Sequence, residues 1–324
     1  MKISVALATY NGQKYIQEQL DSFILQTRLP DELVVCDDGS TDETIEILER
    51  FKKNAPFSVR IYSNNINLGY ERNFEKVIER CDGEIIFLSD QDDAWFPDKI
   101  SIVEAVFESH PNVLVVINNL DITDADLKPT GHNVIGQLQA SRILGADYKG
   151  FIIGCGTAFK SELRALILPI PALKFGHDRW IHGVARSIGS RYVLQQSLQF
   201  YRRHGGNAST YIFDRTKRPT WQDMVQPTVG VDLRPIYANQ RAVLETISNR
   251  LIALGPESYA ELKCTLPFLV ALSFLKNEQS ALTRRILLLD STGLKRKVLV
   301  IHMLINGDYK YFLGWRSFAK DLIR

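Results

Sequence analysis

The sequence predicts an α/β protein with a Rossmann-like, mostly parallel sheet that has helices on both faces, followed by a C-terminal helical region. Two observations predict this class. The first half of the chain alternates short apolar runs with segments of helical periodicity, and from Arg241 onward Leu, Ile and Lys/Arg interleave as in helices. A chain of 324 residues has room for one large or two modest domains. We place the domains at residues 1–210 and 211–324.

Five apolar runs that end at turn or polar residues are the predicted strands. They are Ile3–Thr9, Glu32–Cys36, Val59–Tyr62, Glu84–Leu88 and Val113–Ile117. Helical patterns lie between them. An apolar stripe runs from Tyr15 to Ile24, and Ser40 and Glu43 have the spacing of a capping box that opens a second helix. A third helix is predicted at the end of Asn67–Arg80.

Beyond the fifth strand the periodicity loosens. Gly154-Cys155-Gly156 is a glycine-rich passage, and Gly176–Trp180 precedes a predicted helix that runs to Ala185. Lys217–Pro227 has the composition of a linker between the two predicted domains.

Polar residues cluster directly after three of the predicted strands. These clusters are Thr9–Gly12, Asp37–Ser40 and Asp90–Asp93. In parallel α/β sheets, ligands bind at the edge where the strands end at their carboxyl side. The topology alone therefore predicts that these three turns form a site.

The cluster after the fourth strand is the most acidic of the three. Asp90, Asp92 and Asp93 place three carboxylates within four residues, and such charges repel one another unless a hard divalent cation binds them. An acidic turn that caps the next helix is the alternative. Trp95-Phe96-Pro97 follows immediately and makes the turn highly specified, which favours a functional site.

Composition excludes several classes of protein. Hydrophobic residues make up 45% and charged residues 23%, as in globular proteins, and a net charge of +2 argues against a nucleic-acid binder. Four widely spaced cysteines form no CxxC pair, so we expect reduced thiols and no zinc site. No apolar run approaches a membrane span, and the N-terminus lacks a signal-peptide pattern. We therefore expect a cytoplasmic protein.

Five short motifs, in order along the first two-thirds of the chain, resemble those of the family 2 inverting glycosyltransferases of GT-A fold. The motifs are Ala8-Thr9-Tyr10-Asn11, Asp37-Asp38-Gly39-Ser40-Thr41-Asp42, Asn67-Leu68-Gly69, Ser89-Asp90-Gln91-Asp92-Asp93-Ala94-Trp95 and His177-Asp178-Arg179-Trp180. Members of this family use nucleotide-diphospho-sugars. The Ser-Asp-Gln-Asp-Asp form and Tyr201–Ser209 further resemble the bacterial rhamnosyltransferase-like subgroup.

The resemblance implies roles for the residues in these motifs. Thr9 and Tyr10 belong to the turn that cradles the nucleoside, and Asp38 would accept the N3–H of uracil or thymine. Asn67 and Gly69 are the third motif of the nucleotide site. Asp90 would hold the ribose or a metal-bound water.

The resemblance also implies a cofactor, a divalent Mg²⁺ or Mn²⁺ ion. Asp92 would bind this ion. His204 lies in a loop that would close over the diphosphate, together with Arg202 and Arg203, and would reach the metal or a phosphate.

Inversion requires one in-line displacement, in which the acceptor hydroxyl loses its proton as it attacks. Asp178 is the candidate base for that proton, although an Asp at the start of a helix is commonly an N-cap. We expect His177 to orient the site, with a role as the base left as the alternative. Trp180 would offer an apolar platform for a sugar ring.

These residues predict a metal-dependent inverting glycosyltransferase of bacterial surface polysaccharide synthesis. It would move a sugar from a UDP- or dTDP-sugar to a glycan or lipid-linked glycan. The resemblance to the rhamnosyltransferase-like subgroup implies that this sugar is rhamnose. A nucleotidyltransferase is an alternative, but Tyr10-Asn11-Gly12 is not the glycine-rich basic loop that it needs. A non-catalytic nucleotide-sugar-binding regulator is another, and Asp92 and Asp178 argue against it.

Charge is unevenly distributed along the chain. Residues 276–324 carry ten Lys/Arg and four Asp/Glu, a balance of +6. Helices with basic and apolar faces can lie at an anionic membrane surface, so peripheral contact through the C-terminal region is one prediction. The alternative is that the apolar residues pack on the catalytic domain.

Overall fold

The computed structural model describes residues 1–140, 151–172, 176–205, 232–312 and 314–323. The chain divides into two compact units, which are described separately below. Unit 1 is Met1–Pro219 with Leu262–Thr265, and unit 2 is Thr220–Glu261 with Leu266–Arg324. The expected boundary at residue 210, the predicted linker Lys217–Pro227 and the last four residues of Tyr201–Ser209 all lie outside the described residues.

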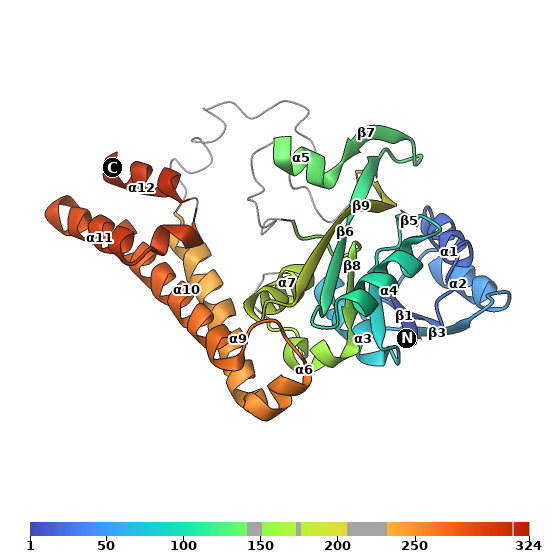
Figure 1. Ribbon diagram of the computed structural model, residues 1–324. Helices are drawn as coiled ribbons and strands as arrows, with labels where there is room; N and C mark the ends of the chain where they lie inside the picture. Colours follow the sequence, from blue (N-terminus) through green and yellow to red (C-terminus); the bar gives the residue numbers. More distant parts are fainter. Residues whose placement is uncertain (141–150, 173–175, 206–231, 313, 324) are drawn as a thin grey trace. The chain divides into compact units, whose positions relative to one another are not determined.

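The described strands of unit 1 form one sheet in the order β3-β2-β1-β4-β8-β6-β9-β5, with β7 paired to β6 (Figure 1). The strands are β1 Ile3–Thr9, β2 Glu32–Asp37, β3 Ser58–Ser63, β4 Ile85–Ser89, β5 Ala94–Trp95, β6 Val115–Thr123, β7 Pro129–Asn133, β8 Thr157–Lys160 and β9 Arg191–Arg202. The first four strands are parallel, as the sequence predicts. The other half is mixed, because β8 runs antiparallel to both β4 and β6, while β9 is parallel to β6.

Helices cover both faces of this sheet, which confirms the predicted fold class (Figure 1). The helical segments of unit 1 are α1 Ile16–Ile24, α2 Thr44–Lys52, α3 Tyr70–Arg80, α4 Lys99–Ser109, α5 Val134–Ala140, η1 Ser161–Leu163, α6 Arg164–Ile167 and α7 His177–Ser187. Helices α1, α2 and α4 share one core with Val5 of β1 and Phe87 of β4. Alternate strand residues face opposite sides, and α3 packs against β1 and β2 on the other side. Helix α7 packs against α3.

The start of α2 differs from the prediction. The helix begins at Thr44 rather than after Ser40, and no capping box forms. Ser40 instead donates its hydroxyl to Asp37 Oδ1 at 2.5 Å. Asp42 Oδ1 accepts the backbone N–H of Thr44 at 3.1 Å. The buried carboxylate of Asp37 has therefore drawn Ser40 into the turn after β2 and away from the helix end.

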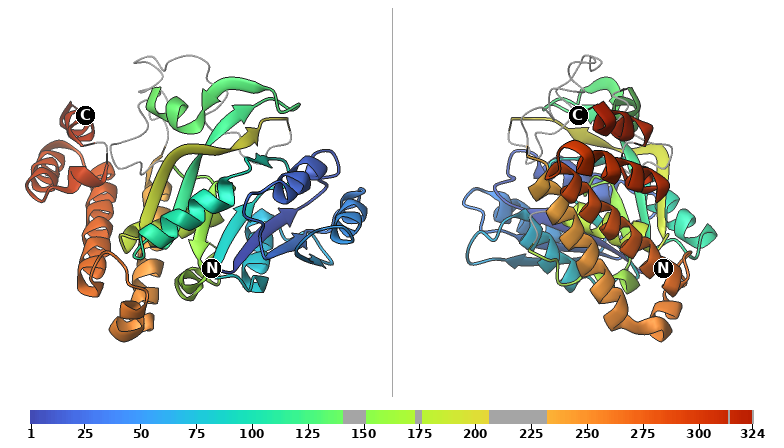
Figure 2. Two further views of the ribbon diagram at one scale, coloured as in Figure 1. Left: turned by 45° about the vertical axis from the view of Figure 1, so that its right-hand side comes forward. Right: turned by 90° about the vertical axis from the view of Figure 1, so that its left-hand side faces the viewer.

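Unit 2 is helical in its described residues. Its elements are α9 Arg234–Glu261, α10 Phe268–Leu289, α11 Gly293–Ile305, η3 Asp308–Tyr311 and α12 Trp315–Ile323. The course of α9 breaks at Gly255, whose φ of 77° is left-handed, and Pro256 follows. Helices α9 and α10 run side by side, and α11 packs against α10 (Figure 2). None of the described helices combines the length and apolar character needed to cross a membrane.

Candidate active site

The turns after β1 and β4 are joined by one side chain, Gln91. Its Oε1 accepts the backbone N–H of Tyr10 at 2.9 Å, and its Nε2 donates to the carbonyl of Tyr10, also at 2.9 Å. A Cβ at position 12 would lie 2.3 Å from Gln91 Oε1, so a larger residue there would displace the Gln91 amide. Gln91 therefore fixes the acidic turn after β4 to the turn after β1. Gly12 leaves room for the Gln91 side chain.

The turns after β1 and β2 are joined through Asn11. Its backbone N–H donates to Ser40 Oγ at 2.8 Å, and its Oδ1 accepts the backbone N–H of Thr41 at 2.9 Å. Asn11 adopts φ of 46°, a left-handed conformation that asparagine tolerates better than most residues. Tyr10, the predicted nucleoside contact, is 47% exposed beside this junction. The three predicted turns thus form one connected edge.

Thr9 lies behind this edge. Its residue is only 2% exposed, and its hydroxyl donates to Asp37 Oδ1 at 2.8 Å. The Thr9 side chain supports the Asp37 turn, and the predicted role of Thr9 at the nucleotide stays a prediction.

Asp38 holds the third motif in place. Its Oδ1 accepts N–H groups of Asn64 and Leu68, each at 2.9 Å, and its Oδ2 accepts the backbone N–H of Gly69 at 2.8 Å. Asn67 Oδ1 also accepts the Gly69 N–H, at 3.0 Å. Because a carboxylate can accept about four hydrogen bonds, three donors leave one acceptor position, on Oδ2. The predicted contact with a pyrimidine base stays a prediction.

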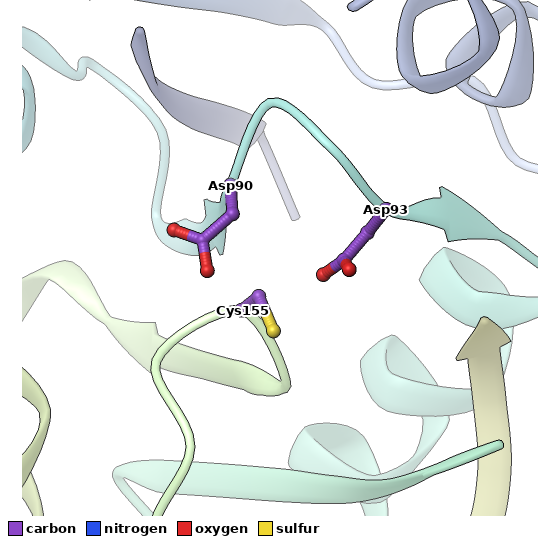
Figure 3. A group of neighbouring side chains, drawn as sticks. All are labelled: Asp90, Asp93 and Cys155. Carbon is purple, nitrogen blue, oxygen red and sulfur yellow. The ribbon is translucent and has the colours of Figure 1, made fainter. Parts of the chain in front are cut away.

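The acidic turn after β4 concentrates negative charge. Figure 3 shows Asp90 and Asp93 on this turn and Cys155 on the facing loop, and their ligand-type atoms all lie within 4.8 Å of one another. Burial, followed by the charge of Asp92, raises the pKa of Asp93 to about 7. Desolvation and the charges of Asp92 and Asp93 hold the pKa of Asp90 well above its usual range. These carboxylates are therefore set up to bind a cation or a proton.

The two predicted metal ligands meet in space. His204 Nε2 lies 2.8 Å from Asp92 Oδ2, although 112 positions separate them in the sequence. Both side chains are partly exposed, at 16% and 17%. The imidazole ring of His204 also lies 4.6 Å from the ring of Tyr15, centroid to centroid. The structure thus brings an imidazole nitrogen and a carboxylate oxygen together at the acidic turn.

A buried lysine lies beneath this turn, and the sequence analysis missed it. Lys99 is 1% exposed, and its Nζ donates to the Cys155 carbonyl at 3.0 Å and to Gln199 Oε1. Gln199 Nε2 in turn donates to Asp93 Oδ2 at 2.9 Å. Burial lowers the pKa of Lys99 to about 7. The helical spacing could have revealed that Lys99 is buried, because Lys99 lies on the same face of α4 as the buried Val103.

Arg202 also holds the acidic turn in place. It is 2% exposed, its backbone N–H donates to Asp93 Oδ1 at 3.2 Å, and its Nε donates to the Asp92 carbonyl at 2.8 Å. The guanidinium also lies 4.5 Å from the ring centre of Tyr15. Arg202 was expected in a loop that closes over the diphosphate. In the structure it is instead the last residue of strand β9 and is buried.

Asp178 lies at the start of α7. Gly176 precedes it with φ of 87°, and a Cβ there would lie 2.7 Å from Asp178 Oδ1, so glycine allows the carboxylate to fold back over the helix end. Oδ1 accepts the backbone N–H of Arg179 at 2.7 Å. Among the described residues none donates a hydrogen bond to Oδ2. The charge of Asp178 is close enough to contribute to the raised pKa of Asp90.

His177 and Trp180 face the core. His177 is 6% exposed and its ring stacks on Phe74 with centroids 4.0 Å apart, and burial lowers its pKa. Trp180 is 1% exposed, and its indole N–H donates to the Ile167 carbonyl at 2.8 Å. The prediction that Trp180 is a sugar platform is therefore wrong. The predicted orienting role of His177 stays a prediction, and its ring packs on Phe74 of α3.

Comparisons with known proteins agree with this fold. The model for "Glycosyl transferase family 2" matches residues 4–164. An uncharacterized glycosyltransferase of Nostoc sp. is 30% identical over 248 residues, which cover 74% of this chain and 75% of that protein. The dTDP-rhamnosyl transferase RfbG of Shigella flexneri is 29% identical over 219 residues, covering 62% of this chain and 72% of RfbG.

A crystal structure of S. aureus TarS 1–349 in complex with UDP-GlcNAc has the same fold. Its TM-score is 0.57 at 18% identity, with 88% of this chain and 83% of that chain covered. The chain belongs to glycosyltransferase family 2 and has the GT-A fold. It is therefore a glycosyltransferase, as the sequence predicts.

The Lys99 network predicts a specific stability effect. Lys99→Met should destabilise unit 1 by about 1–3 kcal/mol, because it leaves the buried Cys155 carbonyl and Gln199 side chain without their donor. The midpoint of denaturant unfolding measures this, with Lys53→Met at an exposed position as the matched control. Equal midpoints for the two variants would contradict the support role of Lys99.

Proposed function

We propose that this glycosyltransferase is a metal-dependent, inverting enzyme that transfers a sugar from a UDP- or dTDP-sugar to a hydroxyl of a bacterial surface glycan. The observation that carries the proposal is the pairing of Asp92 with His204 beside Asp90 and Asp93, at the edge where β1, β2 and β4 end. We expect the reaction on the cytoplasmic side, with a glycan or a lipid-linked glycan as acceptor.

Named relatives support the substrate class but differ in the sugar. RfbG is a dTDP-rhamnosyl transferase, RfbV of Salmonella typhimurium is an abequosyltransferase, and TarS is a poly(ribitol-phosphate) β-N-acetylglucosaminyltransferase. RfbG matches a larger part of this chain than the other two, 62% against 42% and 44%. This match favours a dTDP-sugar and rhamnose as the first donor to test.

The residues present fit a divalent cation. Carboxylate oxygens suit Mg²⁺ and Mn²⁺, and an imidazole nitrogen is compatible with Mn²⁺. Burial and the neighbouring carboxylates raise the pKa values of Asp90 and Asp93, so their ionised forms are disfavoured and a bound cation would offset this. Asp92 and His204 would hold the ion, with Asp90 beside it. A bound cation supplies positive charge that stabilises the departing diphosphate.

Asp178 would act as the base on the acceptor side. Its Oδ2 would take the proton of the acceptor hydroxyl while the new bond forms at the anomeric carbon and the bond to the diphosphate breaks. Its other oxygen already accepts the Arg179 N–H, which fixes the carboxylate orientation. His177 would help to fix the start of α7, since its buried ring stacks on Phe74 of α3.

Metal dependence is tested by Asp92→Asn together with a chelator. Excess chelator should abolish sugar transfer, and Mn²⁺ should raise the melting temperature of the wild type but not of Asp92→Asn, because that variant loses the charge that fixes the ion. Glu108→Gln, at an exposed position of α4, is the control. Full activity in excess chelator would overturn the metal claim.

The base is tested by Asp178→Asn. Transfer at saturating donor should fall roughly 10²–10⁴-fold while donor affinity stays near wild type, because the amide cannot take a proton but keeps the side-chain shape. Steady-state kinetics and calorimetry give the two readouts, with Glu162→Gln as an exposed control. A lost donor affinity with an intact transfer rate would make Asp178 a structural residue instead.

The role of Asp38 is tested by nucleotide preference. The remaining acceptor position on Oδ2 predicts tighter binding of UDP and dTDP than of CDP, because cytosine has no N3–H to donate. Asp38→Asn should reduce this preference, measured as the ratio of dissociation constants by calorimetry. If the variant weakens UDP and CDP equally, Asp38 only positions the Asn67–Gly69 loop.

A further inference from the structure

Helix α11 has two apolar faces, and only one of them is used inside unit 2. Val300 and Met303, at 1% and 0% exposure, point into a core shared with Leu288 and Tyr309. A second set points outward: Leu294, Val298, Ile301 and Ile305 are 79%, 58%, 54% and 78% exposed. We call this second set the outer stripe.

The outer stripe is continuous along the helix. Its members are spaced by four, three and four residues, so at 3.6 residues per turn they lie on one face over the whole length of α11. A helix face in contact with water is ordinarily polar. Scattered exposed apolar residues need no explanation, but a row of four branched aliphatic side chains on one helix does.

Lysines border the outer stripe. From the same helical spacing, Lys297 lies along one edge and Lys295 along the other, and both are exposed. Neither forms an ion pair with any residue in the described part of the chain. The sequence of α11 contains no Asp or Glu. The exposed face of this helix is therefore apolar along its middle and positively charged along both edges.

The acidic residues of the same region are neutralised elsewhere. Asp308 pairs with Arg284 at 2.8 Å and is 2% exposed, and Asp321 pairs with Arg285 and is 4% exposed. Asp290 pairs with Arg234 at 2.9 Å. Because arginines take up these carboxylates inside unit 2, the lysines beside the outer stripe keep their charge for an external partner.

We propose that the outer stripe lies in the boundary between headgroups and acyl chains of an anionic membrane. There the aliphatic side chains would be buried, and the lysine stems could extend so that their ammonium groups reach anionic headgroups. A second copy of the same face is a poorer partner, because it would bring lysines against lysines. This inference does not rest on the proposed donor chemistry, but it would bring the enzyme to a lipid-linked acceptor.

The test is flotation of the full-length protein with vesicles. The wild type should float with phosphatidylcholine vesicles that contain phosphatidylglycerol, remain in solution with phosphatidylcholine alone, and dissociate as salt rises. Val298→Ser combined with Ile301→Ser should weaken binding at least about tenfold, because both side chains would leave the acyl boundary. Lys295→Gln and Lys297→Gln should each weaken it about fivefold.

Matched variants keep the result interpretable. Ile252→Ser with Leu269→Ser removes two exposed aliphatic residues from α9 and α10, and Lys52→Gln with Lys53→Gln removes two exposed charges from unit 1. These controls should float like the wild type. Circular dichroism melting and nucleotide binding, measured for every variant, separate a folding defect or a failed donor assignment from lost membrane binding.

Three outcomes would overturn the inference. The wild type could stay with the soluble fraction on anionic vesicles at low salt. The outer-stripe variant could float as well as the wild type. Sedimentation could instead show a wild-type dimer that the outer-stripe variant abolishes, without any flotation, which would make the stripe an interface between two copies of the chain.

Discussion

Repulsion among the carboxylates of Asp90, Asp92 and Asp93 is the constraint on which the rest of the site depends. These groups cannot spread apart, because Gln91 fixes the turn to the backbone of Tyr10. His204 Nε2 lies 2.8 Å from Asp92 Oδ2 at the exposed side of the turn. On the buried side, Lys99 reaches Asp93 through Gln199. The turn is thus held by hydrogen bonds in an arrangement that its charges alone would disfavour, as a cation site requires.

The same constraint explains why distant segments end where they do. Strand β9 ends with Arg202 inserted under the turn, which places His204 two residues later beside Asp92. The loop before β8 supplies the Cys155 carbonyl to Lys99, and Gly154 in that loop allows close approach, since a Cβ there would lie 2.9 Å from His177 Nε2. Residues far apart in sequence therefore meet at the site because each of them contacts or supports the acidic turn.

The sequence predicted the frame of the site better than the direction of its side chains. Strand β1 has the predicted bounds, because apolar runs and turn residues are local signals. The prediction for Trp180 was wrong because a motif does not show which face of the helix a residue occupies. Its i+4 partner Val184 is buried as well, which marks the inward stripe of α7. Lys99 was missed for the opposite reason, since a charged residue on a buried phase contradicts the usual expectation for lysine.

The net charge of the C-terminal residues also predicted less about unit 2 than the structure shows. The balance of +6 over residues 276–324 indicates that a partner is plausible, yet it cannot say whether the excess charge is spread or gathered. The ion pairs show this: Arg284 and Arg285 bind buried carboxylates, whereas Lys295 and Lys297 form no ion pair with a residue that the structure describes. Arginine suits such buried pairs, since its planar guanidinium can donate to both oxygens of a carboxylate. The division between inward arginine and outward lysine, rather than the total charge, gives α11 its basic, apolar outer face.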